Sequence, residues 1–212
     1  MPIATQPALQ PRKRPVQARS AVTVEAILEA SLQVLVAVGK ERLTTTLVAQ
    51  RAGVSVGTLY QYFPNKSALL QAALRRHMNE VGESIAAVCA QHRGDPLLAM
   101  GTALLDAYLA AKMKSVKTSA ALYAISSDID GAAIARTSAQ RGARRVAELF
   151  ATASEGLTKE PEVVASMVLA AFNGTSRRLL ESRHPEREYA GLREELAVMV
   201  QAYLSTCIAP QV

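Results

Sequence analysis

The sequence predicts an all-α protein, with a small group of three helices near the N-terminus and a larger helical region after it. Alanine, leucine and glutamate abound, aromatic residues make up only 4% and tryptophan is absent, which favours helices over sheets. Apolar residues recur at helical spacing between glycine and proline breaks. With 212 residues, 50% of them hydrophobic and 20% charged, the chain can bury a core.

The first 20 residues have no apolar periodicity and are predicted to form a disordered basic arm. Pro2, Pro7, Pro11 and Pro15 remove backbone donors and block helix continuation. The arm does not read as a secretory signal, because no apolar stretch of sufficient length follows its charges. The first helix is therefore expected at about 22–39.

The second helix is predicted over 45–52. Leu47 and Val48 give it an apolar face, and Thr44 or Thr45 can cap its free amides with a hydroxyl oxygen. A short helix of this kind needs another element against its apolar side.

A third helix is predicted over 56–63, after a glycine turn. Gly53 can reach the left-handed conformation that ends a helix, and Ser55 can cap the next one. Leu59 and Phe63, four residues apart, are expected to face the core. Two short helices joined by such a turn form a helix-turn-helix.

The opposite face of this third helix carries small and hydrogen-bonding groups and no acidic residue. It consists of Val56, Gly57, Thr58, Gln61 and Tyr62. A DNA major groove admits one helix, so small side chains at the helix start allow close approach while Thr58 and Gln61 offer donors and acceptors. Tyr60, Tyr62 and Lys66 are expected to reach phosphates. The alternative is a glycine turn between two helices with no role in DNA binding.

The segment resembles the DNA-binding signature of the TetR family of bacterial transcriptional regulators, over roughly residues 20–75. The matching residues are Ala52-Gly53-Val54-Ser55, Gly57-Thr58-Leu59-Tyr60, Tyr62-Phe63 and Lys66, with Ile27, Leu28, Ala30 and Gly39 before them. The resemblance implies a helix-turn-helix DNA-binding domain over 21–66 and a C-terminal helical effector-binding and dimerisation domain over 67–212. It also implies a ligand-responsive repressor that binds a palindromic operator.

The resemblance further implies which residues lie at or near DNA. The predicted contact set is Thr44, Thr45, Val56, Gly57, Thr58, Tyr60, Gln61, Tyr62 and Lys66, together with Ser55 at the turn and Arg14 in the arm.

The charge distribution supports this interpretation independently. Residues 1–66 hold eight Lys or Arg against three acidic residues, a net charge of +5, whereas the rest of the chain holds 16 against 15, a net charge of +1. A protein that meets a polyanion at one end is expected to show this asymmetry. The alternative is a basic tail that only aids solubility.

Further helices are predicted between the remaining breaks. They are expected over 66–92, from Pro96 to about 113, over 115–126, over 131–153, from Pro161 and from about Pro185. The helix over 66–92 has a long apolar stripe and is expected to link the DNA-binding part to the rest.

The last two helices carry apolar residues on more than one face, which predicts a homodimer. Two such helices per subunit would form a four-helix bundle around a twofold axis. The alternative is that both faces lie inside a large monomeric core.

A small, largely apolar effector is expected to bind among the middle and late helices. The candidate ligand residues are Met113, Tyr123, Met167, Asn173 and Arg177. Asn173 and Arg177 are the more specific pair, because a few polar groups orient the ligand in an apolar pocket.

Neither an enzyme nor a cofactor is predicted. No histidine accompanies a recognisable nucleophile, and the spacing of Glu181 and His184, which di-iron bundles use in duplicate, has no second copy. Cys89 and Cys207 belong to no metal or disulfide motif and indicate reduced thiols in the cytoplasm. The sequence has no uninterrupted apolar run of about 18 residues, so no membrane span is predicted.

A helical adaptor, which would use the helix-turn-helix for protein contacts, remains the rival function. Salt dependence separates the two, because DNA binding weakens steeply as salt is added.

Overall fold

The computed structural model describes residues 14–129 and 131–210, with side chains described from residue 20 onward except at 127 and 128. This part of the chain is all-α, as predicted. Its elements are α1 (Arg14–Arg42), α2 (Thr45–Ala52), α3 (Val56–Tyr62), α4 (Lys66–Gln91), α5 (Leu97–Met113), α6 (Val116–Ile125), the 3-10 helix η1 (Ser126–Ile129), α7 (Gly131–Phe150), α8 (Pro161–Glu181) and α9 (Pro185–Ser205).

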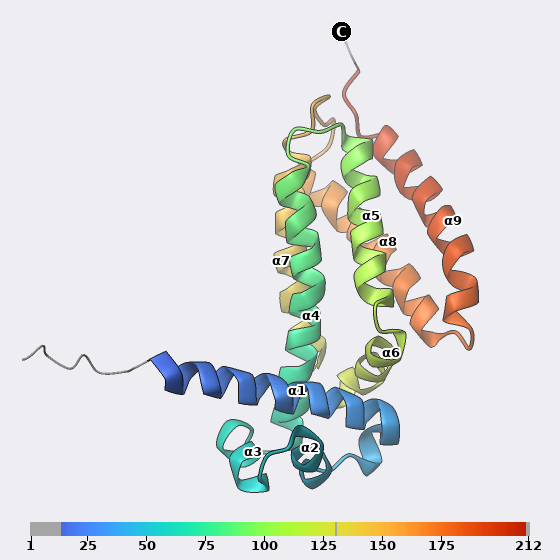
Figure 1. Cartoon of the computed structure of the whole chain (residues 1–212). Helices are drawn as coiled ribbons and strands as arrows, with labels where there is room; N and C mark the ends of the chain where they lie inside the picture. The colour runs from blue at the N-terminus through green and yellow to red at the C-terminus, as the bar shows by residue number, and fades with distance from the viewer. Residues whose placement is uncertain (1–13, 130, 211–212) are drawn as a thin grey trace, which may run out of the picture.

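The long helix α4 organises the molecule (Figure 1). Helix α1 lies across one end of α4, with α2 and α3 beyond it. Helices α5 and α7 pack along the rest of α4, α8 and α9 pack on these two, and α6 lies next to α1. We call α1 to α3 the head and α5 to α9 the body. The described C-terminal residues lie at the end of the body remote from the head (Figure 1).

The predicted starts of α2, α3 and α4 are confirmed by their caps. Thr44, Ser55 and Asn65 each accept a hydrogen bond from a backbone amide three residues on, at 3.2, 3.0 and 2.8 Å. Gly53 ends α2 in the left-handed conformation, with φ 69°, which a side chain would disfavour.

Helix α1 differs from the prediction at both ends. It begins at Arg14 rather than near residue 22, so residues 14–20 are helical where a disordered arm was predicted. The first turn of a helix needs no amide hydrogen, so Pro15 can start a helix as well as stop one. At the other end, α1 continues through a kink at Gly39, with φ 75°, to Arg42.

The head core is built mainly from one face each of α1, α2 and α3. Leu59 and Phe63 are buried in it, as predicted. The prediction for Leu47 is wrong, because this side chain is 40% exposed while Val48 and Ala49 are buried. Successive helical residues point about 100° apart, so a two-turn helix that buries Val48 and Ala49 turns Leu47 outward.

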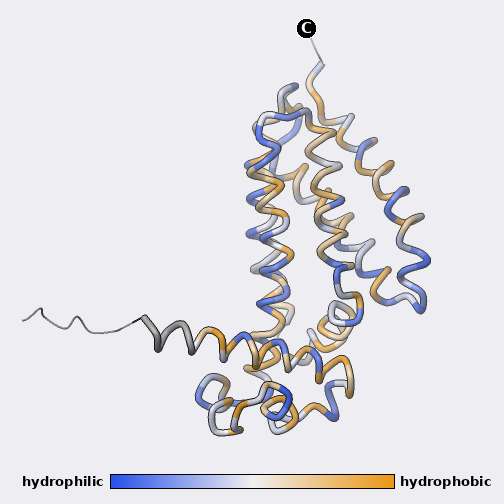
Figure 2. The backbone as a smooth tube through the Cα atoms, viewed as in Figure 1, coloured by the Kyte–Doolittle hydropathy of each residue, from blue (hydrophilic) through white to orange (hydrophobic). Residues whose placement is uncertain are grey.

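Helix α4 belongs to two hydrophobic cores. Near its start, Leu69, Leu70 and Leu74 join the head core, whereas Val81 and Ile85 join the body core. The domain boundary predicted between residues 66 and 67 therefore falls at the first turn of a shared helix. Figure 2 shows hydrophobic and hydrophilic residues alternating along α4, as expected for a helix with one covered side.

The body helices follow the predicted breaks, with one shortening. Helix α7 ends at Phe150 and not near residue 153, and a non-helical segment leads to α8. Leu157 and Ile208 form an isolated antiparallel bridge that ties this segment to the chain after α9. Helix α6 packs against α1, so the body touches the head at a second place besides α4.

One segment, Ser20–Arg42 within α1, is long and apolar enough to cross a membrane by length and composition. Its side chains Ile27 and Leu35 are buried in the head core. The apolar content of α1 is therefore that of a helix packed inside a folded domain.

Candidate DNA-binding surface and ligand cavity

The outer face of α3 is open to solvent. Gly57 and Gln61 are exposed, Tyr60 is 48% exposed, and no acidic residue occurs in α2, α3 or the turn between them. A Cβ atom added at Gly57 would meet only the Ser55 hydroxyl, at 3.7 Å. Packing within the chain therefore does not require a glycine here.

Hydroxyl contacts fix the two helices of this face against each other. The Thr45 and Tyr60 hydroxyls lie 3.1 Å apart, which joins the start of α2 to α3. The Ser55 and Thr58 hydroxyls lie 2.8 Å apart at the start of α3. The exposed face is thus held in one arrangement before any partner binds, which reduces the entropy cost of binding.

Three other residues predicted to contact DNA make contacts within the protein itself. Val56 and Tyr62 are partly buried and pack against the head core. Lys66 is partly buried, and its ammonium donates a hydrogen bond to the Lys40 carbonyl at 2.5 Å. A positive charge is thereby placed beside the C-terminal end of α1. The side chain of Arg14 lies outside the described residues.

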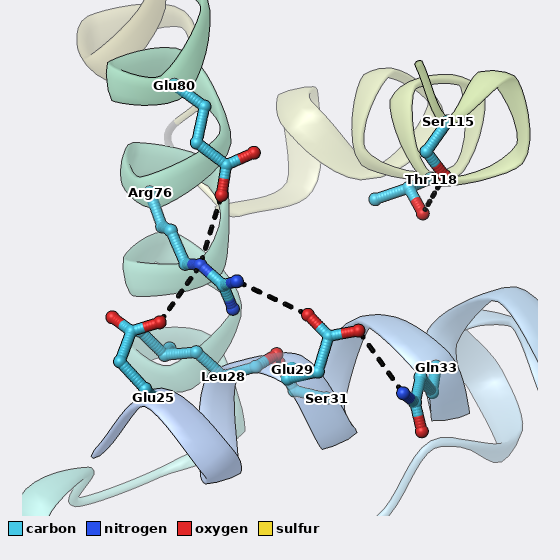
Figure 3. A network of polar contacts seen from close by, with 9 residues as sticks. All are labelled: Glu25, Leu28, Glu29, Ser31, Gln33, Arg76, Glu80, Ser115 and Thr118. Atoms are coloured by element: carbon cyan, nitrogen blue, oxygen red, sulfur yellow. Dashed lines mark hydrogen bonds and ion pairs between the residues drawn. The ribbon is translucent and has the colours of Figure 1, made fainter. Parts of the chain in front are cut away.

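The sequence analysis missed a polar network between the head and α4 (Figure 3). Arg76 of α4 pairs with Glu25 and Glu29 of α1 at 3.2 and 3.3 Å, and with Glu80 at 3.2 Å. Gln33 continues the network along α1 by donating to Glu29 at 3.2 Å. The pairs Arg76–Glu80 and Glu29–Gln33 have helical spacing, whereas the contacts of Arg76 with Glu25 and Glu29 join distant parts of the chain and could not be found from sequence patterns.

A cavity of about 800 Å³ lies between α4, α5, α7 and α8. Small residues on α7 and α4 leave this space open, and they are Ala132, Ala135, Ala139, Gly142, Ala143 and Gly82. A second cavity of about 160 Å³ lies beside it, bounded partly by α6. Met78, Lys112, Ala132, Ala135 and Asn173 line both.

The structure brings three of the five predicted ligand residues to these cavities. Asn173 lines both cavities, while Tyr123 and Arg177 line the smaller one. Met113 and Met167 line neither, and Met167 is 55% exposed on α8. Six residues are about one and two-thirds helical turns, so Met167 cannot share the inward direction of Asn173.

The cavities also contain polar residues that the sequence analysis missed. The Tyr108 hydroxyl donates to Asn173 Oδ1 at 2.7 Å, and burial raises the pKa of Tyr108 to about 12. His77 Nε2 lies 3.2 Å from the Ser119 hydroxyl. Burial, and then the charge of Lys112, lowers the pKa of His77 to about 4, so the ring is neutral near pH 7.

The outer faces of α8 and α9 carry exposed apolar side chains. Val163 and Met167 lie on α8, and Val198 and Met199 lie on α9. Each is more than half exposed. Large exposed apolar patches of soluble proteins are commonly interaction surfaces, which makes these side chains candidates for one.

The pair Glu181 and His184 shows no metal-site geometry. Glu181 accepts from Arg177 Nε at 3.0 Å, and His184 is exposed before α9. No group of three potential metal ligands occurs among the residues that the structure describes.

This fold and surface define a class, the helix-turn-helix transcriptional regulators, and comparison with known proteins specifies the family. Residues 27–73 match the family described as bacterial regulatory proteins, tetR family, and residues 96–204 match that of the tetracyclin repressor-like C-terminal domain. The chain belongs to the TetR family of transcriptional regulators. Members of these families are DNA-binding regulators and not enzymes.

Relatives among curated proteins are similar over a limited part of their length. The uncharacterized HTH-type transcriptional regulator YvkB of Bacillus subtilis is 37% identical over 87 residues, which are 40% of this chain and 44% of YvkB. The HTH-type transcriptional repressor KstR of Mycolicibacterium smegmatis is 46% identical over 55 residues, 26% of this chain and 27% of KstR. The chain thus matches less than half of the length of these relatives.

Solved structures share the fold over most of the chain. A putative TetR-family regulator from Mesorhizobium loti superposes with a TM-score of 0.71 at 19% identity, over 90% of this chain and 99% of that one. The fatty acid degradation regulator FadR from Bacillus halodurans gives a TM-score of 0.64 at 15% identity, over 82% and 94%.

Proposed function

We propose that this protein is a cytoplasmic, ligand-responsive repressor that binds a palindromic DNA operator as a homodimer and leaves it when a small molecule binds the body. The observation that carries the proposal is the exposed, acid-free face of α3 at one end of the molecule. Its members Gly57 and Gln61 are open to solvent, so a major groove can reach them.

The exposed apolar residues of α8 and α9 support the homodimer. The two helices pack against each other, so a second copy of the same pair would complete a four-helix bundle. Twofold symmetry would then present two α3 helices to one duplex, and a palindromic site would engage both.

Contacts of the cavity walls with the head support a ligand response. The cavities are bounded by α4 and α6, and both helices pack against α1. A ligand that spreads these walls would tilt the head and change the spacing of the two α3 helices. The ligand and the operator would then favour different arrangements of the same dimer, which makes their binding antagonistic.

Selection of bound duplexes from a random pool tests DNA binding. Recovery of a palindrome, and an affinity that falls steeply with added salt, are the expected results. An affinity for duplex DNA that is weak and indifferent to salt would overturn the proposal and favour the adaptor function.

The double substitution Met167→Asp and Val198→Asp tests the dimer surface. Two new charges on each copy should block the bundle, so sedimentation should show monomers and operator affinity should fall. Ala90→Asp, on an exposed part of α4, adds a charge elsewhere and should leave the dimer intact. Dimers that persist in the double variant would place the interface on another surface.

A further inference from the structure

Lys112 is a basic side chain in the cavity walls that forms no ion pair with the acidic side chains the structure describes. It lies near the end of α5 and lines both cavities. No carboxylate of the described residues lies within 4.0 Å of its ammonium, and its nearest ring contact is Tyr108, whose centroid is 5.8 Å from Nζ. Burial lowers the pKa of Lys112 because the charged form loses hydration.

The polar groups beside Lys112 are already paired with one another. The Tyr108 hydroxyl donates to Asn173, and the Asn173 amide donates to the Leu169 carbonyl at 2.9 Å. Buried charges in proteins are normally paired, because an unpaired one loses solvation without compensation. Lys112 is partly buried, and its ammonium has no acceptor among the side chains of this wall that the structure describes.

The charges around the larger cavity are mostly positive as well. Arg136, Arg141 and Arg145 of α7 line it together with Lys112, against the single acidic residue Glu83. Such a cluster attracts anions toward the cavity before any direct contact forms.

The rest of the wall suits an apolar body. Met78, Val81, Ile85 and Leu169 line the larger cavity, along with the small residues of α7. A volume of about 800 Å³ lies within the range of small-molecule sites.

We infer that the effector of this protein is an organic anion with an apolar body, whose charged group pairs with Lys112 while the body lies against α4, α7 and α8. The inference rests on the proposed ligand-responsive function and specifies the chemistry of its ligand. A carboxylate or sulfonate would supply the missing acceptor, and the apolar part would be buried among Met78, Ile85 and Leu169.

Two fluorescent probes with the same rings test the inference. One is 8-anilinonaphthalene-1-sulfonate, which is anionic, and the other is N-phenyl-1-naphthylamine, which lacks the sulfonate. Lys112→Met should weaken binding of the anionic probe by about tenfold or more and leave the neutral probe nearly unchanged. Lys114→Met removes an exposed charge two residues away and should alter neither.

Further variants locate the site and keep the test decisive. Ala135→Phe should exclude both probes, because Ala135 lines both cavities. Lys112→Gln repeats the test with a polar side chain, and circular dichroism checks that each variant folds. Displacement of the anionic probe by decanoate should depend on Lys112 in the same way.

The outcomes separate the inference from the proposed function. If Lys112→Met weakens both probes equally or neither, the anion assignment is overturned while the cavity remains a ligand site. If neither probe binds the wild type, the inference and the ligand response both fail. Operator binding by the same variants, measured by gel shift, tests DNA recognition separately.

Discussion

The head and the body are both helical, but they keep their polar side chains in different places. In the head, Thr44 and Ser55 bond to groups a few residues away, and the hydrogen-bonding residues of α3 face solvent. Around the cavities, Tyr108 of α5 and His77 of α4 lie inside, with partners 65 and 42 residues away. A surface that reads DNA can be encoded within one short segment, whereas a cavity must be assembled from several distant ones.

The largest expected effect is the loss of operator affinity on substitution of Gly57 in the exposed face of α3. Gly57→Glu should lower operator affinity by about 100-fold or more, because a carboxylate would meet the phosphates and the floor of the groove. The fold should survive, since a Cβ at this position has open space. Gel shift measures the operator affinity and circular dichroism measures the helicity. Ala90→Glu at the far end of α4 is the control. Loss of helicity in Gly57→Glu would mean that the surface and the fold are not separable.

The next effect concerns the buried His77 of α4 beside the smaller cavity. The pKa of His77 lies at about 4 in the folded protein, below its usual value, so folding releases a proton when the unfolded chain carries one. The free energy of unfolding should therefore fall as the pH drops from about 6.5 toward 4, by roughly 3 kcal/mol. Above pH 6.5 this group should have no effect.

Urea denaturation at several pH values measures this dependence. His77→Gln should remove this part of the pH dependence, while His184→Gln, at an exposed position, should retain it. An unchanged slope in His77→Gln would assign the acid sensitivity to other groups.

A smaller effect on the free energy of unfolding tests whether the Arg76 network couples the head to α4. Arg76→Met leaves the carboxylates of Glu25, Glu29 and Glu80 facing one another without a cation, and should cost about 1 to 2 kcal/mol of unfolding free energy. Arg75→Met removes a neighbouring exposed arginine and should cost less than about 0.5 kcal/mol. Equal costs would show that the network contributes nothing beyond ordinary surface charge.

The smallest expected effects distinguish phosphate contact by Lys66 from base contact by Thr58. Lys66→Ala should weaken all duplexes similarly and reduce the dependence of log affinity on log salt by about one unit. Thr58→Ala should instead change the preference among operator variants, by about 1 kcal/mol, because we expect its hydroxyl to reach base edges. Fluorescence anisotropy across several duplexes and salt concentrations distinguishes them. Uniform weakening by Thr58→Ala would remove this residue from sequence reading.

The helix boundaries were largely predictable because their signals are local. Gly53, Ser55 and Asn65 act on amides and carbonyls within a few residues, so their roles follow from spacing. Pro15 shows the limit of such signals, since a proline fits the first turn of a helix as well as a break. The orientation of Leu47 was mistaken because adjacent apolar residues leave the direction of a short helix open.

The cavity lining was less predictable than the solvent exposure of the α3 face. Asn173 and Arg177 were predicted as polar groups on an apolar helix, and Tyr123 as a further candidate, but no local sequence pattern distinguishes Lys112 or Tyr108. Met167 has the composition expected of a pocket residue and lies on the outside of α8. Which side of an apolar helix faces a cavity depends on its neighbours, and these are distant in the sequence.

The order of the helices, their caps, the acid-free third helix and the basic character of the N-terminal part were determined by the sequence itself, because backbone hydrogen bonding and side-chain charge act over short chain distances. The tertiary structure decided that Arg76 joins α1 to α4, and that short side chains on α7 leave a cavity lined by Lys112. These features arise where helices far apart in the chain pack together, and the space between packed helices depends on both partners at once.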